Sequence, residues 1–386
     1  MSRPIRLIQA SAAVLSLALA AAACGSSGGS SAGSGASSGG TSTGSAAASN
    51  RPSWCGSKKI TVALADGFGD NNWRKITRAE AASEAAKCSS VTKYLYTDGQ
   101  GNTQKSISDI QGLVSQGVNA LVVFPDSGPA VLPAIRSAFK AGVAVVPYRV
   151  SPGGTAGQDY DTFIKTDFAA AGVLWAKWMV KALHGKGNIA NLGGPPANSQ
   201  SLAEYQGMQT VFKNYPGIHF VGQTPYNVTN WDPATTQQVV SSLLSKYPTI
   251  NAVVSDFGTA LAASFPAFQK AGRQIPVIAT EDGNSLGCDY ATMSASDPGF
   301  KLFTVSSQTW MVEYAMRYAI ALATKGKVPS STVVPQQNFE NSVTGSPNKP
   351  VCNQALPATA IMSSGLTATE QQAALKGVIP SLTSLR

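Results

Sequence analysis

The sequence predicts an α/β protein with two doubly wound parallel-sheet lobes. Short apolar runs of strand length alternate along the chain with amphipathic stretches of helical spacing. This alternation occurs twice, once in each half of the chain that follows residue 50. Apolar strands separated by helices are typical of parallel sheets covered on both faces, so each half is expected to form one lobe.

The first series of elements begins near residue 59. Residues 59–64 form an apolar run, and residues 72–87 are rich in Ala and Glu, with Ile76 and several alanines on one side. This is the pattern of a strand followed by a helix. Further strands are expected at 91–96, 120–124 and 143–147, and further helices at 103–116 and 129–141.

The second series begins near Phe168 and echoes the first. Asn-Ala-Leu-Val-Val at 119–123 is followed by Ala-Phe-Lys-Ala-Gly at 138–142, and Asn-Ala-Val-Val at 251–254 by Ala-Phe-Gln-Lys-Ala-Gly at 267–272. Sheets of this kind bind ligands beyond the carboxyl ends of their strands, so we expect a cleft between the lobes, lined by residues just after strands. The strands of the second series are expected around Ile189, Phe220, Val253 and Ile278.

The amino end has the layout of an export signal. Its first residues are basic, and residues 7–23 form an apolar run of mainly Ala and Leu that ends in small residues. Gln9, Ser11 and Ser16 interrupt this run, which favours a cleaved signal over a membrane-spanning helix. We expect residues 1–23 to be the signal peptide.

Cys24 follows three alanines and precedes Gly-Ser-Ser. This context resembles the bacterial lipobox, in which cleavage leaves a cysteine that carries diacylglycerol, although Ala21 stands where that motif usually has Leu. Residues 25–50 are all Gly, Ser, Ala, Thr or Asn and cannot bury enough apolar surface to fold. We therefore expect a lipidated Cys24 and a Gly/Ser-rich tether over 24–50, attached to the outer face of the cell membrane.

The charge pattern argues against a nucleic-acid partner. The net charge of +9 falls to +7 once Arg3 and Arg6 leave with the signal, and no Lys/Arg cluster interleaves with aromatic residues. No group of His, Cys, Asp and Glu has the spacing of a metal site, and nothing in the sequence resembles a phosphate-binding loop. We expect neither a metal nor a cofactor.

Four cysteines remain beside Cys24, and an even number in an exported chain favours disulfides. Three pairings are possible. Cys55 precedes the first expected strand and Cys88 the second, so both lie at one sheet edge if these strands are neighbours. We therefore favour Cys55 with Cys88, which leaves Cys288 with Cys352.

One motif points to hydrolysis but lacks its partners. Residues 283–287, Gly-Asn-Ser-Leu-Gly, match the G-x-S-x-G nucleophile elbow, in which the acid and the histidine follow the serine. His184 and His219 are the only histidines, and both precede Ser285. We expect that the protein is not an enzyme.

Several motifs stand just after expected strands, where a ligand is expected. They are Asp-Asn-Asn-Trp at 70–73, Pro-Tyr-Arg at 147–149, Asn-Trp-Asp at 230–232, Glu-Asp-Gly at 281–283 and Ser-Ser-Gln at 306–308. In this order, from about residue 58 to residue 335, the chain resembles the ribose-binding-protein-like, type I periplasmic binding proteins.

The resemblance implies two lobes joined by a multi-strand hinge. It places 51–165 and 309–334 in the N-terminal lobe, and 166–308 and 335–386 in the C-terminal lobe. It also implies a monomer that passes a small sugar-like ligand to the permease subunits of an ABC importer. Two alternatives stay open: a receptor that uses the same closure for signalling, and a non-sugar ligand such as an amine or a nucleoside. A repressor of the same architecture is excluded, because a signal and a tether occupy the place of its DNA-binding motif.

The resemblance also gives roles to three residues. Trp73 and Trp231 would clamp the ligand between their rings from opposite lobes. Arg149 would donate two parallel hydrogen bonds to ligand oxygens. The alternative roles are packing for the two tryptophans and a salt bridge between the lobes for Arg149.

Two further polar residues complete this expected site. Asp282 resembles the family's carboxylate that accepts hydrogen bonds from sugar hydroxyls, whereas Glu281 is expected to point the other way along its strand. Gln308 matches a hinge glutamine of the family, with an ordinary polar residue at a helix start as the alternative.

Three residues depart from the family pattern at expected ligand contacts. Tyr148 stands where the family has Asp, Glu204 where it often has Arg, and Phe257 where it often has Asn. These three residues predict a pocket that is more acidic and more aromatic than a ribose site. Its ligand is expected to be a polyol, a deoxy or amino sugar, or a small cationic metabolite.

Overall fold

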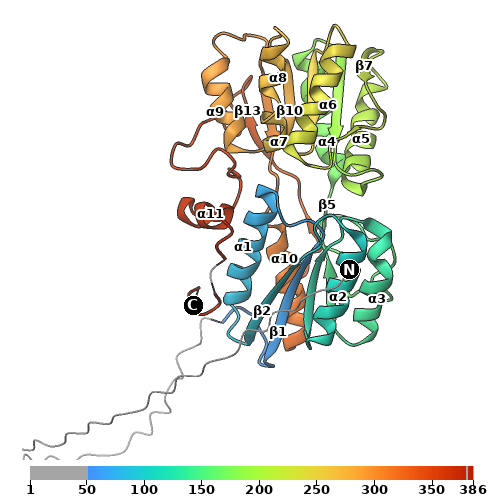
Figure 1. Cartoon of the computed structure of the whole chain (residues 1–386), viewed down its shortest axis with the longest axis vertical. Helices are drawn as coiled ribbons and strands as arrows, with labels where there is room; N and C mark the ends of the chain where they lie inside the picture. The colour runs from blue at the N-terminus through green and yellow to red at the C-terminus, as the bar shows by residue number, and fades with distance from the viewer. Residues whose placement is uncertain (1–50, 380, 386) are drawn as a thin grey trace, which may run out of the picture. The chain divides into compact units, whose positions relative to one another are not determined.

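The computed structural model describes residues 51–379 and 381–385 (Figure 1). The expected signal peptide, the lipidated Cys24 and the tether lie outside this range. In the described part, no helix combines the length and apolar character needed to cross a bilayer.

The N-terminal lobe is built on a four-stranded sheet in the order β2-β1-β3-β4, all parallel. Val62 and Leu64 of β1 face one core with α1 and α10, whereas Ala63 and Ala65 face another core with α2 and α3. The two-sided burial explains why the strands are continuous apolar runs. The elements are β1 (Ile60–Asp66), α1 (Asn72–Ala86), β2 (Val91–Asp98), α2 (Thr103–Ser115), β3 (Ala120–Phe124), η1 (Gly128–Val131), α3 (Leu132–Lys140), β4 (Ala144–Pro147) and α10 (Met311–Thr324).

The C-terminal lobe contains a seven-stranded sheet in the order β13-β11-β10-β9-β6-β7, with β8 paired to β6. Only β13 is antiparallel to its neighbour among these described strands. Helices cover both faces here as well. The elements are α4 (Phe168–Ala182), β6 (Lys186–Gly193), α5 (Ser199–Phe212), β7 (Gly217–Val221), β8 (Asn227–Val228), α6 (Pro233–Lys246), β9 (Ala252–Ser255), α7 (Gly258–Ala262), α8 (Phe265–Lys270), β10 (Val277–Glu281), α9 (Asn284–Met293), β11 (Leu302–Val305) and β13 (Asn338–Asn341).

The chain crosses between the lobes at 148–165, 306–310 and 335–337. The first and last crossings are held together by a small parallel pair, β5 (Lys165–Thr166) with β12 (Val333–Val334). The Thr166 hydroxyl also donates to the Val334 carbonyl at 2.7 Å. The α/β fold class and the doubly wound sheets expected from the sequence are confirmed.

Two disulfides join the cysteines in the expected pairs, Cys55 with Cys88 and Cys288 with Cys352. The Cα–Cα distances are 5.3 and 4.2 Å. Cys55 and Cys88 are both buried in the core between β1, α1 and α10. Cys288 lies on α9, so the second disulfide fastens the carboxyl-terminal stretch to the C-terminal lobe.

Residues 352–375, which we call the C-terminal strap, continue from this disulfide to the other lobe. The Asn284 side chain at the start of α9 donates to the carbonyls of Leu356 and Pro357, at 3.2 and 3.1 Å. Gly287 of α9 permits the close approach of Val351, which lies just before the strap, because a Cβ at Gly287 would lie 2.1 Å from the Val351 carbonyl oxygen.

The strap then ends on the N-terminal lobe, where α11 (Ala368–Leu375) packs against α1 (Figure 1). Ile361 of the strap is fully buried in the core that contains Ile76 of α1. Residues 335–386 were expected to finish the C-terminal lobe. The structure corrects this, because only β13 joins that lobe's sheet, whereas the strap returns to the N-terminal lobe.

A buried carboxylate holds the strap to α1. Glu80 is fully buried, and its Oε1 accepts from the Ser364 hydroxyl at 2.6 Å, the Thr309 hydroxyl at 2.9 Å and the Gly365 amide at 3.2 Å. Burial raises the pKa of Glu80 to about 8, although the Ser364 and Thr309 hydrogen bonds oppose the shift.

We predict that Glu80→Gln flattens the pH dependence of stability. The folded protein holds a proton on Glu80 that the unfolded chain releases near pH 4.5, so the free energy of unfolding falls as the pH rises towards 8. One group contributes a slope of at most about 1.4 kcal/mol per pH unit. Urea unfolding at pH 5 and pH 8 measures it. Glu370→Gln on α11 is the control, and equal slopes in both variants would contradict the prediction.

We predict that Cys288→Ser/Cys352→Ser loosens the strap. Loss of either disulfide should lower the free energy of unfolding by about 2 to 5 kcal/mol. Only loss of Cys288–Cys352 should also speed amide hydrogen exchange in residues 353–375, because of the two disulfides it is the one that includes a strap residue. Cys55→Ser/Cys88→Ser is the matched control. The same exchange rates for the strap in both double variants would refute this role.

Candidate functional site

The candidate site is a small inner cavity of about 20 Å³, lined mostly by buried side chains, between the carboxyl ends of strands from both lobes. Arg149 follows β4, Asp256 follows β9 and Glu281 ends β10, as expected for residues that line such a cleft. The residues that line the inner cavity are Asn71, Trp73, Arg74, Phe124, Arg149, Gln200, Trp231, Asp256, Phe257 and Glu281.

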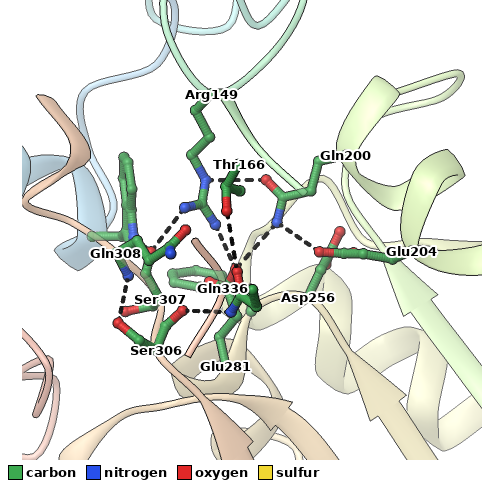
Figure 2. A network of polar contacts seen from close by, with 12 residues as sticks. Arg149, Thr166, Gln200, Glu204, Asp256, Glu281, Ser306, Ser307, Gln308 and Gln336 are labelled. Atoms are coloured by element: carbon green, nitrogen blue, oxygen red, sulfur yellow. Dashed lines mark hydrogen bonds and ion pairs between the residues drawn. The ribbon is translucent and has the colours of Figure 1, made fainter. Parts of the chain in front are cut away.

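Arg149 is the centre of the polar contacts in this cavity (Figure 2). Its Nη2 donates to Glu281 Oε1 at 2.5 Å, its Nε to Gln200 Oε1 at 3.1 Å and its Nη1 to the Ser307 carbonyl at 2.8 Å. Arg149 has a φ of 63°, a conformation that costs a non-glycine residue free energy. In this arrangement it forms the salt bridge between the lobes that was the alternative to ligand contact.

Three buried carboxylates of the C-terminal lobe surround Arg149. Gln200 donates through Nε2 to Glu204 Oε1 at 3.2 Å and to Glu281 Oε1 at 3.3 Å. Burial raises the pKa of Glu281 to about 8 against the opposing charge of Arg149. Burial also raises the pKa of Asp256 to about 6 and the pKa of Glu204 well above its usual value.

Aromatic rings form the apolar walls of the inner cavity. Trp73 meets Phe124 edge to face, with centroids 5.8 Å apart, and its Nε1 donates to the Ser307 carbonyl at 3.0 Å. The Arg149 guanidinium lies 4.8 Å from the Trp73 ring centroid. Trp231 and Phe257 contribute rings from the other lobe. Trp73 and Trp231 thus line one cavity from opposite sides.

The helix α5 carries Gln200 and Glu204 and is held close to α4 by Gly207. A Cβ at Gly207 would lie 2.0 Å from the Ala169 carbonyl oxygen of α4. The Asn198 side chain caps α5 by accepting from the Gln200 amide at 2.9 Å. These contacts fix the direction in which Gln200 points into the cavity.

The structure reverses the expected placement of two neighbouring carboxylates. Glu281 lines the inner cavity, whereas Asp282 does not. Asp282 Oδ1 accepts from the Ser307 amide at 2.7 Å and the Ser363 hydroxyl at 2.7 Å, and Oδ2 accepts from the Ser363 amide at 2.7 Å. The strap therefore uses the hydrogen-bonding capacity of Asp282, and Glu281 replaces Asp282 in the proposed site.

Gln308 and Tyr148 also lie outside the lining of the inner cavity. Gln308 is fully buried, and its Nε2 donates to the Pro335 carbonyl at 2.8 Å, so it joins two crossings of the hinge. Tyr148 packs its ring edge to face on Phe124, with centroids 5.2 Å apart. Glu204 contacts the cavity through Gln200 rather than lining it.

Arg74 is a site residue that the sequence reasoning missed. It is 2 % exposed, and its guanidinium lies 3.2 Å from the centroid of Phe124. Its Nη1 donates to Asp66 Oδ1 at 3.0 Å and its Nη2 to Asp126 Oδ1 at 2.6 Å. One feature of the sequence could have indicated this role: Arg74 is next to Trp73 in the first turn of an expected helix that has an apolar face. Asn71, Phe124, Gln200 and Asp256 were missed as well.

A second, larger cavity adjoins the inner one at Trp231. This outer cleft has a volume of about 890 Å³ and is also lined from both lobes. Among the described residues, no group of three or more His, Cys, Asp and Glu side chains could hold a metal ion.

Comparison with known families fits this geometry. The family model described as periplasmic binding protein domain matches residues 62–327. The chain belongs to this family. The periplasmic binding protein described here is similar to several characterised relatives and solved structures.

Two relatives illustrate the similarity. The xylitol-binding protein of Mycolicibacterium smegmatis is 24% identical over 209 residues, which is 53% of this chain and 58% of the relative. The ribose import binding protein of Bacillus subtilis is 26% identical over 235 residues, 61% of this chain and 73% of the relative. The periplasmic binding protein thus spans little more than half the length of the first of them.

Solved structures share the fold. A galactofuranose binding protein superposes with a TM-score of 0.63 at 21% identity, covering 72% of this chain and 94% of its own. The Caulobacter myo-inositol binding protein gives a TM-score of 0.64 at 20% identity, with 72% and 93% covered. The two-lobed fold of this periplasmic binding protein is therefore the type I fold expected from the sequence.

We predict that Arg149→Met destabilises this periplasmic binding protein by about 3 to 5 kcal/mol, because Glu281 then stays buried without its ion-pair partner. Chemical unfolding of Arg149→Met, Glu281→Leu and the double variant measures the coupling between the two side chains. The double variant should lose less free energy of unfolding than the sum of the losses in the two single variants. Arg136→Met is the control, because its ion pair with Asp159 is partly exposed. Additive effects of the two changes would contradict the prediction.

Proposed function

We propose that the protein is a solute-binding protein that captures a sugar or polyol-like small molecule between its lobes and delivers it to an ABC importer. The observation that carries this proposal is Arg149, which reaches from a hinge crossing to Gln200 and Glu281 of the other lobe inside an aromatic-walled cavity. Two named relatives bind xylitol and import ribose, which supports a polyhydroxylated ligand.

The mechanism requires the lobes to separate before a ligand can enter. A cavity of roughly 10 to 15 Å³ holds one water molecule. The inner cavity of about 20 Å³ therefore has room for about one water molecule and is too small for a sugar. On entry, ligand hydroxyls would take over the hydrogen bonds that Arg149 now makes to Glu281 and Gln200. Closure around the ligand would then shift the population towards the form that a permease recognises.

Ring faces and charged groups suit a polyhydroxylated ligand for different reasons. The rings of Trp73 and Trp231 offer apolar area to the C–H faces of a sugar. Carboxylates accept hydrogen bonds from hydroxyls, and the guanidinium donates to hydroxyl oxygens. Glu281 and Arg149 therefore provide both halves of hydroxyl recognition.

A hydrolytic role has no support at Ser285. Its amide donates to the Ala358 carbonyl of the strap at 2.8 Å, and its buried hydroxyl has no hydrogen-bond partner among the described residues. A serine nucleophile needs a base within hydrogen-bond reach. This supports a binding protein without catalytic activity.

We further propose an exported monomer held to the outer face of the membrane through Cys24. The support is the signal-like run and the lipobox-like context of Cys24 in the sequence. The two disulfides agree with an oxidising, extracytoplasmic location.

A calorimetric screen over pentitols, hexitols, pentoses and hexoses tests the proposed function. We expect at least one of them to bind and to raise the melting temperature. Glu281→Gln should then weaken binding roughly ten-fold or more, because a charged hydrogen bond to the ligand is lost.

Asp282→Asn is the matched comparison. It should lower the melting temperature through the lost strap contacts but change the affinity little. Binding that survives Glu281→Gln and disappears in Asp282→Asn would refute our assignment, and no binding by any member of the screen would refute the function.

A further inference from the structure

The buried charges around the inner cavity do not balance. Arg149 is paired with Glu281, and Arg74 with Asp66 and Asp126. These five side chains already carry one more carboxylate than guanidinium. Their burial makes any remaining imbalance costly, because water cannot screen it.

Glu204 and Asp256 add two further carboxylates to this cluster. They are 3 and 4 % exposed, and neither forms an ion pair with any described residue. Burial raises the pKa of both groups, so they hold protons more readily than ordinary carboxyl groups. A buried carboxylate is stabilised by a proton or by a cation.

Asp256 and the Trp231 indole meet at the same place. Asp256 Oδ2 accepts from the Ser201 hydroxyl at 2.5 Å, and the Trp231 side chain opposes the rise that burial causes in the pKa of Asp256. Asp256 Oδ1 and Trp231 Nε1 face each other in this way, but neither makes a hydrogen bond of ordinary geometry. Trp231 and Phe257 line the cavity beside Asp256, and such ring faces attract cations.

The size of the inner cavity limits what can occupy it in the arrangement described here. A volume of about 20 Å³ accommodates about one water molecule. An ammonium group has nearly the size of a water molecule and donates hydrogen bonds in several directions. A whole sugar ring is too large, whereas one amino group fits.

The outer cleft has the complementary chemistry for the rest of a ligand. Its volume is about 890 Å³, and its lining includes hydroxyl and amide groups of Ser127, Ser151, Asn198, Ser199 and Asn230. Among the described residues that line it, the charged ones are Asp126 and Asp232, and none is basic. Trp231 belongs to both cavities and connects them.

We propose that the ligand is an amino-substituted polyol or sugar. Its protonated amino group enters the inner cavity beside Asp256 and the Trp231 ring, with Glu204 behind Gln200 adding negative charge, and its hydroxylated body lies in the outer cleft. The inference rests on the proposed function, since it specifies the class of molecule that the cleft captures. It also gives a reason for Glu204, which stands where a ribose-type site often has an arginine.

Matched pairs of neutral and amino compounds test this inference. Isothermal titration calorimetry at pH 7.5 compares glucitol with 1-amino-1-deoxyglucitol, xylitol with 1-amino-1-deoxyxylitol, and glucose with glucosamine. We expect the amino member of at least one pair to bind ten-fold or more tightly than its neutral partner. Tighter or equal binding of the neutral member in every pair that binds would overturn the inference while leaving the proposed function intact.

Two isosteric variants locate the amino group. Asp256→Asn and Glu204→Gln each replace an ionisable carboxyl group, which can pair with an ammonium group, by a neutral amide of similar shape, and each should reduce the preference for the amino compound at least ten-fold. Asp289→Asn on α9 makes the same charge change outside both cavities and should leave the preference unchanged. A preference that persists in both cavity variants would overturn the placement. Binding of neither member of any pair, when another sugar or polyol of the wider screen does bind, would also overturn the inference, whereas the proposed function falls only if no member of that screen binds.

Discussion

The interaction on which the rest of the structure depends is the buried contact of Arg149 with Glu281 and Gln200. It joins a hinge crossing of the chain to the ends of elements in the C-terminal lobe. A guanidinium buried in this way needs a carboxylate partner, and the partner needs the guanidinium. The same groups that would bind a ligand therefore bind each other across the cleft, and a ligand has to compete with them.

The fold could be predicted because its signals are local. Apolar runs and helical spacing identified the elements of both lobes, and the position of Cys55 and Cys88 before neighbouring strands led to the correct pairing. Trp73, Arg149, Trp231 and Phe257 were predicted as ligand contacts from the family resemblance and from their places after strands, and all four line the inner cavity.

The site could be predicted only in part, because the rest depends on contacts distant in sequence. Alternation along β10 did not reveal which of Glu281 and Asp282 faces the cavity, since Ser363, 81 positions later, binds Asp282. Arg74 carries no local mark of its role either, because its partner Asp126 lies 52 positions away. Contacts between residues so far apart in the sequence form only in the assembled fold, and the spacing of residues along the chain does not indicate them.

The strap has a consequence for the order in which the chain can fold. The N-terminal lobe is assembled from the first part of the described chain, from α10 and from the strap, and Ile361 is a fully buried part of its core. The α1 surface that the strap covers therefore stays open to water until the last stretch of the chain has been synthesised. A chain of this design completes its first lobe last, and until then that lobe exposes apolar surface that favours aggregation.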